Sequence, residues 1–142
     1  MKNKTFGNIH ITKIEKEKVW KLRHKVMWPD RDLDYVKLED DHLGIHFGLF
    51  KENMLISVIS LFINNEVCQF RKFATLQTEQ GKGYGSTLLD YVMNEAMDCG
   101  VKRIWCNARK NKLGFYKKFG LQDTNYSFNK GGKAYVIMEK NL

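Results

Sequence analysis

A glycine-rich segment followed by a helical pattern is the part of this sequence that most clearly indicates chemistry. Its residues are Gln80, Gly81, Lys82, Gly83, Tyr84, Gly85 and Ser86. Glycine lets the backbone adopt positive φ and approach a ligand closely, while the first N–H groups and the dipole of a helix attract an anion. A plain strand-to-helix turn is the alternative, but such a turn rarely needs three glycines. We therefore predict that this segment binds phosphate.

Two common nucleotide-binding motifs differ from this segment. A P-loop ends in Gly-Lys followed by Ser or Thr, whereas Gly85 is followed directly by Ser86. A dinucleotide fingerprint needs a third glycine, and the chain has Ser86 or Leu88 there, depending on which glycine pair is counted. The fingerprint also needs an acidic residue at the end of the next strand, where this chain has Asn107. Both nucleotide interpretations therefore fail.

The elements that must position the segment follow from the spacing of apolar residues. We predict a short β-prone stretch at 9–12, a helix at 16–28, a loop or short helix at 30–41, strands at 43–49, 54–63 and 66–75, a helix from 85 that stops at Gly100, a strand at 102–106, a helix at 111–119 and a strand at 134–140. Three strands joined by short turns form an antiparallel meander, and a βαβ unit follows it. The sequence thus predicts one α+β domain over residues 1–142, with a mixed central sheet flanked by helices.

The strand at 43–49 alternates strictly between two kinds of residue. The alternation predicts one apolar face and one face of glycine and histidine. The apolar face comprises Leu43, Ile45, Phe47 and Leu49, and the other comprises Gly44, His46 and Gly48.

The chain is basic, with 24 lysines and arginines against 16 acidic residues. Such an excess favours an anionic partner. Many of the basic residues follow the glycine segment, namely Lys102, Arg103, Arg109, Lys110, Lys112, Lys117 and Lys118. A nucleic-acid-binding protein would need a basic stripe interleaved with exposed aromatic residues. Because the cluster instead surrounds the expected phosphate site, we expect no nucleic-acid partner.

Other classes of protein are disfavoured by what the sequence contains. Cys68, Cys99 and Cys106 are odd in number and lack metal-type spacing, so we expect reduced cysteines and no metal site. No apolar run approaches the roughly 20 residues needed to cross a bilayer. Residues 1–5 carry charge without a following apolar segment, which disfavours a secretory signal. We therefore expect a cytoplasmic protein with no membrane partner.

The chain resembles the GNAT family of N-acetyltransferases in several places. Residues 80–85 resemble the family's Q/R-x-x-G-x-G/A motif, and a strand ending at Thr75 precedes them as it does in the family. Residues 115–121 resemble the FY-x-x-x-GF ending, with Leu121 in place of the last Phe. Residues 105–109, Trp-Cys-Asn-Ala-Arg, resemble a bacterial subgroup of the family. The resemblance extends from about residue 43 to the end of the chain.

The resemblance implies a donor, a reaction and a set of site residues. The donor would be acetyl-CoA, with its pyrophosphate on the glycine segment, and an amine would attack it directly in a ternary complex. The pantetheine arm would follow the preceding strand, where Phe73, Ala74 and Thr75 contact it and a main-chain N–H stabilises the oxyanion. Tyr116 would protonate the departing thiolate, because a phenol with a pKa of about 10 is protonated at neutral pH. The remaining candidate cofactor contacts, which can equally be solvated surface, are Asn107, Arg109 and Asn111.

The resemblance leaves the acceptor side open. Glu66 lies far from the expected acetyl position, and His46 titrates in a suitable range but can be a hydrogen-bonded residue of the sheet. Arg71 can pair with a substrate carboxylate or bridge to an acidic residue among Glu39, Asp40 and Asp41. Tyr135 occupies a position where the subgroup often has histidine. The acceptor can be a small-molecule or peptide amine, and a homodimer is common in the family.

A non-catalytic acetyl-CoA-binding module is the alternative function. Its mark would be the loss of the tyrosine or of the loop glycines. Both Tyr116 and the glycines are present.

Overall fold

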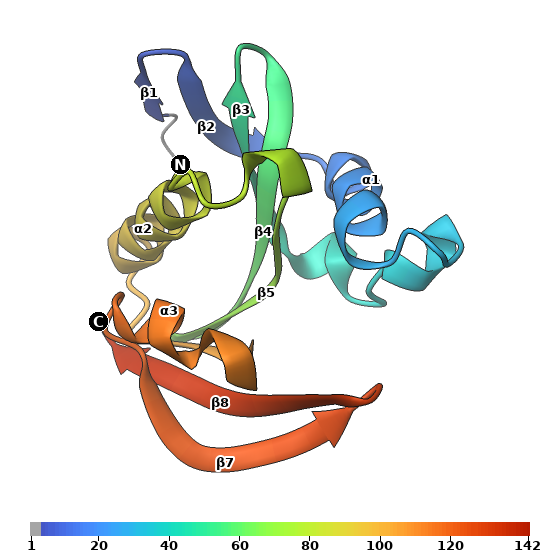
Figure 1. Cartoon of the computed structure of the whole chain (residues 1–142). Coiled ribbons are helices and arrows are strands. Elements are labelled where there is room, and N and C mark those ends of the chain that lie inside the picture. The colour runs from blue at the N-terminus through green and yellow to red at the C-terminus, as the bar shows by residue number, and fades with distance from the viewer. Residues whose placement is uncertain (1–3) are drawn as a thin grey trace.

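The computed structural model describes residues 4–142, and the strands of this range form one mixed eight-stranded sheet (Figure 1). The strands are β1 Lys4–Phe6, β2 Ile9–Ile14, β3 Ile45–Lys51, β4 Met54–Asn64, β5 Val67–Thr75, β6 Arg103–Arg109, β7 Gln122–Lys130 and β8 Lys133–Asn141. Their order across the sheet is β1-β2-β3-β4-β5-β6-β8-β7. Within the described range β5 and β6 pair in parallel and the other neighbours pair antiparallel. The predicted α+β class, with a meander leading into a βαβ unit, is confirmed.

Helices cover both faces of this sheet (Figure 1). The helices are α1 Lys16–Met27, α2 Tyr84–Asp98 and α3 Leu113–Lys117, with short 3-10 helices η1 Leu33–Val36, η2 Asp41–Leu43, η3 Gln77–Glu79 and η4 Lys110–Lys112. On one face, Val19 and Leu22 of α1 pack against Val58 of β4. On the other, α2 and α3 pack with Ile59 in the larger core. Val58 and Ile59 are consecutive, so their opposite directions follow from the period of two in a strand.

The sheet opens between β5 and β6, and this opening positions the site. The two strands pair only at Val67–Arg103, Cys68–Ile104 and Gln69–Trp105. Beyond Gln69, the edge of β5 has no strand partner on the β6 side in the described chain. A bulge in β5 accompanies the divergence, because Lys72 and Phe73 together face the single residue Ile59 of β4. Such a bulge bends its strand and re-aims its side chains.

The start of β3 differs from the prediction. Leu43 was expected on the apolar face of a strand, but it belongs to η2 and its side chain is 70% exposed. The strand begins at Ile45, and its inward face is formed by Phe47 and Leu49. The physical reason is Asp41, whose carboxylate accepts the N–H of Leu38 at 2.8 Å and holds the preceding residues in a turn.

The region after α2 also differs from the prediction. The helix expected at 111–119 is divided into η4 and the five-residue α3, and Gly114 within it weakens helical propensity. β7 was not predicted, because its side chains are mostly polar and only Thr124 and Phe128 are half-buried. An edge strand needs little apolar surface. The available signal was Gly131-Gly132, whose φ values of 58° and 77° suit a tight hairpin turn between β7 and β8.

No helix within residues 4–142 has the length and apolar character needed to span a membrane.

Candidate functional site

The glycine segment joins the end of β5 to the start of α2. The side-chain amide of Gln80 donates a hydrogen bond to the carbonyl of Thr75 at 2.9 Å, which ties the segment to the last residue of β5. Gly81 and Gly83 then adopt φ values of 77° and 88°, in the left-handed region that glycine enters without strain. The sequence-predicted loop is therefore a strand-to-helix turn whose shape requires glycine at two positions.

The N-terminus of α2 is open toward solvent at this turn. Gly83 is the N-cap, and no side chain of the described residues caps the helix. The first N–H groups of a helix lack intrahelical partners, so they remain available to an anion here. A Cβ atom on Gly85 would lie 3.2 Å from the Phe73 ring and 3.3 Å from the Thr75 hydroxyl. Gly85 thus lets the first turn of α2 pack closely against the unpaired end of β5.

A buried carboxylate gathers two lysines beside the loop. Glu79 lies 3.3 Å from the ammonium of Lys51, at the end of β3, and 3.4 Å from the ammonium of Lys82. Lys51 also stacks over the Tyr84 ring at 5.4 Å. Sequence reasoning missed Glu79 and Lys51. The spacing of Glu79 and Lys82 was an available signal for one pair, whereas the contact with Lys51 depends on the tertiary fold.

Tyr116 of α3 lies beside the point where β5 and β6 diverge. Its ring centroid is 5.8 Å from that of Phe70, the first residue of β5 beyond the paired segment. Burial raises the pKa of Tyr116 above its ordinary value, and the nearby Cys106 of β6 raises it further. The phenol is therefore protonated throughout the neutral range.

The other predicted contacts divide between the two faces of the sheet. Phe73 points toward α3, with its ring 6.2 Å from that of Phe115, whereas the Ala74 side chain is buried against α1. The hydroxyl of Thr75 is 2.8 Å from that of Ser57. Asn107 and Arg109 are exposed, and they alternate along β6 with Cys106 and Ala108, which belong to the α2–α3 core. The structure therefore places Asn107 and Arg109 on the face of β6 opposite to Tyr116, and Asn111 is exposed in η4.

A buried ion pair anchors the residues that cover the α1 face. Arg23 of α1 donates to both carboxylate oxygens of Asp41, at 2.7 and 2.9 Å, and also to the Ser60 hydroxyl at 2.9 Å. Trp20 donates to the same carboxylate at 2.8 Å. Burial acts to raise the pKa of Asp41, but the hydrogen bonds from Arg23, Leu38 and Trp20 outweigh it, so the pKa lies below its ordinary value. Sequence reasoning assigned no role to Arg23 and missed this pair.

His46 is part of the same network. Its Nδ1 lies 2.7 Å from the Ser60 hydroxyl and its Nε2 lies 2.8 Å from the Asp41 carbonyl oxygen. Burial lowers the pKa of this imidazole. Both ring nitrogens therefore have partners, and His46 has no free nitrogen to act as a base. Of its two predicted roles, the structure supports that of a hydrogen-bonded residue of the sheet.

Arg71 forms an ion pair with an acidic residue of the chain, which was one of the two roles predicted for it. Its Nη1 lies 3.0 Å from both carboxylate oxygens of Asp40, and its Nε donates to the Gln69 side chain at 2.7 Å. Glu66, as expected, lies far from the loop, at the opposite end of β5 from Thr75.

We expect Arg23→Met to lower the free energy of unfolding by about 3–5 kcal/mol, because it leaves the Asp41 carboxylate buried without its cation. Urea unfolding at pH 7 measures this, with the exposed Lys21→Met on the same helix as a control of equal charge change. Because the folded-state pKa of Asp41 is depressed, its contribution is complete above the ordinary value of 3.8 and is lost as the pH falls below it. An Arg23→Met protein as stable as Lys21→Met would contradict the assignment.

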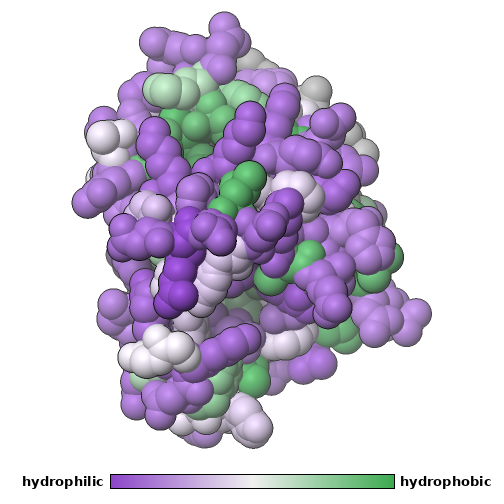
Figure 2. Space-filling view, turned by 90° about the vertical axis from the view of Figure 1, so that its right-hand side faces the viewer, coloured by the Kyte–Doolittle hydropathy of each residue, from purple (hydrophilic) through white to green (hydrophobic). Residues whose placement is uncertain are grey.

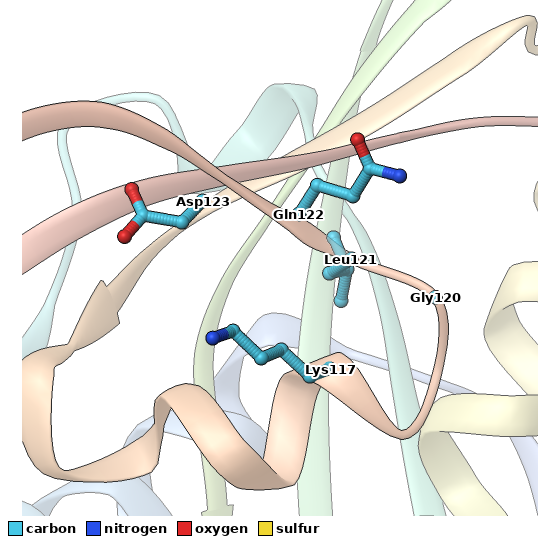
Figure 3. A pocket seen from close by; sticks show the side chains of 5 residues that line it. All are labelled: Lys117, Gly120, Leu121, Gln122 and Asp123. Carbon is cyan, nitrogen blue, oxygen red and sulfur yellow. The ribbon is translucent and has the colours of Figure 1, made fainter.

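A surface pocket lies between the end of α3 and the start of β7 (Figure 3). Its lining consists of Lys117, Gly120, Leu121, Gln122 and Asp123. None of these is a predicted site residue, and the glycine turn and the unpaired edge of β5 lie elsewhere. The candidate site is the gap between β5 and β6, with the glycine turn near one end and Tyr116 near the other.

Comparison with known proteins shows the family of this chain. Residues 13–121 match the model of the acetyltransferase (GNAT) family. This chain belongs to the GNAT family. It is 28% identical to the uncharacterized N-acetyltransferase YitI of Bacillus subtilis, over 94% of this chain and 97% of that protein.

Solved structures share the GNAT fold. A candidate N-acetyltransferase from Lactobacillus plantarum superposes with a TM-score of 0.85 at 20% identity, covering 96% of this chain and 99% of that one. A GNAT acetyltransferase from Elizabethkingia anophelis, solved with acetyl-CoA bound, superposes with a TM-score of 0.76 at 17% identity, covering 95% and 99%. The predicted GNAT-like fold and the assignment as an acyltransferase are thus confirmed.

Proposed function

We propose that this GNAT protein transfers the acetyl group of acetyl-CoA to a small-molecule or peptide amine, by direct attack in a ternary complex. The observation that carries the proposal is the gap between β5 and β6, which has the uncapped N-terminus of α2 near its open end and Tyr116 near its closed end. A ligand whose phosphate binds at α2 can follow the unpaired edge of β5 toward Tyr116. The acetyl-CoA bound to the Elizabethkingia relative supports the choice of donor.

The residues at the gap fit a pyrophosphate followed by an extended arm. The first N–H groups of α2 and the ammonium of Lys82 would bind the phosphates, and Lys51 would add positive charge from the end of β3. The backbone of Phe73, Ala74 and Thr75 would pair with the amides of the arm as a neighbouring strand does. Glu79 would hold both lysines in place beside the loop.

The chemistry assigned to this chain is stabilisation of an oxyanion and donation of a proton. The amine nitrogen forms a bond to the carbonyl carbon and the carbon–sulfur bond breaks. The main-chain N–H of Phe73, held by a rigid sheet, would donate to the carbonyl oxygen as negative charge develops there. Tyr116 would give its phenol proton to the leaving sulfur. The proton that the amine loses is left to water, because no side chain of the described residues is assigned as a base.

We expect acetyl-CoA to raise the melting temperature, because it binds the folded state alone. At one hundred times the dissociation constant the gain is about 2.7 kcal/mol, which corresponds to roughly 5–10 °C for a chain of this size. Differential scanning fluorimetry measures the shift, and ATP at the same concentration controls for a phosphate-bearing nucleotide without a pantetheine arm. An unchanged melting temperature at millimolar acetyl-CoA would contradict the choice of donor.

Turnover separates an enzyme from a binding module. Release of the CoA thiol, followed with a thiol reagent against a panel of amines, is expected to be faster with the protein and an acceptor than with either alone. Tight acetyl-CoA binding without turnover of any amine would favour the non-catalytic module.

A further inference from the structure

Three cations belong to α1 and β5, and two of them already have anionic partners. Arg23 pairs with Asp41, and Arg71 pairs with Asp40. The third is Lys72, which follows Arg71 directly in β5. Its side chain is half-buried, and among the residues that the structure describes no hydrogen bond or ion pair involves its ammonium. Partly buried ammonium groups are ordinarily paired, so this one is unusual.

The backbone at Lys72 is unusual as well. Lys72 occupies the β5 bulge and has a φ of 55°, in the left-handed region that non-glycine residues rarely adopt. Strained positions of this kind often occur at functional sites, where the surrounding structure enforces them. The bulge lies within the unpaired part of β5, beside Phe73, whose N–H is the proposed oxyanion donor.

The charges that act on Lys72 come from the α1 side of the sheet and from the β7–β8 hairpin. Burial lowers the pKa of Lys72, and the positive charges of Arg23 and Lys130 lower it further, while Asp41 acts in the opposite sense. Arg23 and Asp41 lie on the α1 face, and Lys130 is the last residue of β7. Lys72 is therefore within electrostatic reach of both the α1 face and the end of β7.

Two elements meet on this side of the molecule. The ammonium of Lys133, at the start of β8, lies 4.7 Å from the centre of the Trp28 ring at the end of α1, so the hairpin and the α1 side meet there. Figure 1 shows the hairpin tip and α1 on the same side of the molecule. Figure 2, which views the molecule from that side, shows a mostly hydrophilic surface with hydrophobic groups in separate patches. Such a surface suits a polar acceptor.

The two faces of β5 then divide the reaction between them. Phe70 and Phe73 point toward α3 and Tyr116, which is the donor side in the proposed function. Arg71 and Ala74 point toward α1 and η2, and the charges of Arg23 and Asp41 on that side act on Lys72. An amine that attacks one face of the planar carbonyl from the α1 side of β5 would approach past Lys72.

We propose that Lys72 binds a carboxylate of the acceptor, so that the substrate is an amine that also carries a carboxylate, as free amino acids and peptides do. An acceptor carboxylate would supply the anion that Lys72 lacks, by a charge-assisted hydrogen bond. The flexible ammonium stem suits a single carboxylate oxygen, whereas the rigid guanidinium of Arg71 is already held by Asp40 and Gln69. This inference rests on the proposed acetyl transfer to an amine.

The test compares matched acids and amides as acceptors. Thiol release from acetyl-CoA is measured with free amino acids against their α-amides, and with dipeptides against their C-terminal amides, which distinguishes a free amino acid from a peptide. We expect kcat/KM to be about tenfold higher for the acid than for the amide in at least one of the two series. Lys72→Met is expected to remove this preference, Lys72→Arg to keep part of it, and the exposed Lys21→Met to leave it unchanged.

The outcomes separate this inference from the proposed function. Equal kcat/KM for acids and amides, or a preference that persists in Lys72→Met, would overturn the role of Lys72 while leaving acetyl transfer intact. If acetyl-CoA raises the melting temperature but no carboxylate-bearing amine is turned over, the inference is wrong and the donor site stands. If acetyl-CoA also fails to bind, the proposed function itself is wrong. Lys72→Gly also lacks the ammonium but adopts the positive φ without strain. If it loses the preference as Lys72→Met does, the loss comes from the charge. If it keeps the preference, the loss in Lys72→Met comes from the backbone and the role of Lys72 is overturned.

Discussion

Gly83→Asp is expected to abolish acetyl-CoA binding while the protein stays folded. Gly83 is the N-cap of α2 and has a φ of 88°, and a Cβ atom there would meet nothing within 4 Å. Aspartate tolerates left-handed backbone better than most residues and is a favourable N-cap, so we expect the fold to survive. Its carboxylate would occupy the N–H groups proposed for the pyrophosphate and repel the phosphates. Losing two charge-assisted hydrogen bonds lowers affinity by about a hundredfold or more, which isothermal titration calorimetry measures.

A matched control lies at the other end of the same helix. Gly100 follows α2, has a φ of 84° and has equally open space around its Cβ position. Gly100→Asp therefore imposes a similar backbone strain and the same charge change, away from the loop. We expect it to keep wild-type affinity. Retained affinity in Gly83→Asp would show that the loop is not the phosphate site, whereas loss in both variants would indicate a general effect on folding.

The glycine turn and the helix after it were predictable because their determinants are local in sequence. Three glycines between a strand and an amphipathic helix indicate a turn with positive φ at a helix N-terminus. The structure has that turn, with Gly81 and Gly83 in the left-handed region. The strands β4 and β5 and the helix α2 were predicted for the same reason, since their apolar spacing repeats over ten or so residues.

The long-range ion pairs were not predictable, because each of them joins distant segments of the chain. Arg23 and Asp41 are 18 residues apart, and Lys51 and Glu79 are 28 apart, so no local pattern joins them. In the sequence Arg23 is one more polar residue of a helix. Only the fold shows that its side chain is fully buried and needs an anion. The bulge at Lys72 was hidden for a similar reason, since it arises from the register of β4 and β5.

The two faces of the sheet also separate Tyr116 from two of the predicted cofactor contacts. Asn107 and Arg109 were candidate cofactor contacts that can equally be solvated surface, and their direction along β6 places them opposite to Tyr116. Their side chains therefore leave the sheet on the face that carries Arg71. A cofactor that follows the edge of β5 could reach their backbone more readily than their side chains. Their contact with the cofactor stays a prediction.

Tyr116→Phe is expected to lower kcat by about 10²–10⁴-fold while acetyl-CoA affinity stays nearly unchanged. The ring packing against Phe70 and Phe115 is apolar and survives the change, so only the proton donor to the leaving sulfur is removed. Because burial raises the pKa of Tyr116, the wild-type enzyme should show no loss of this acid through the neutral and mildly basic range. Steady-state kinetics with calorimetry for acetyl-CoA measures both quantities. Tyr91→Phe, which removes another buried phenol hydroxyl from the α2 core, is the control and should leave kcat unchanged. A Tyr116→Phe enzyme with wild-type kcat would show that water protonates the thiolate.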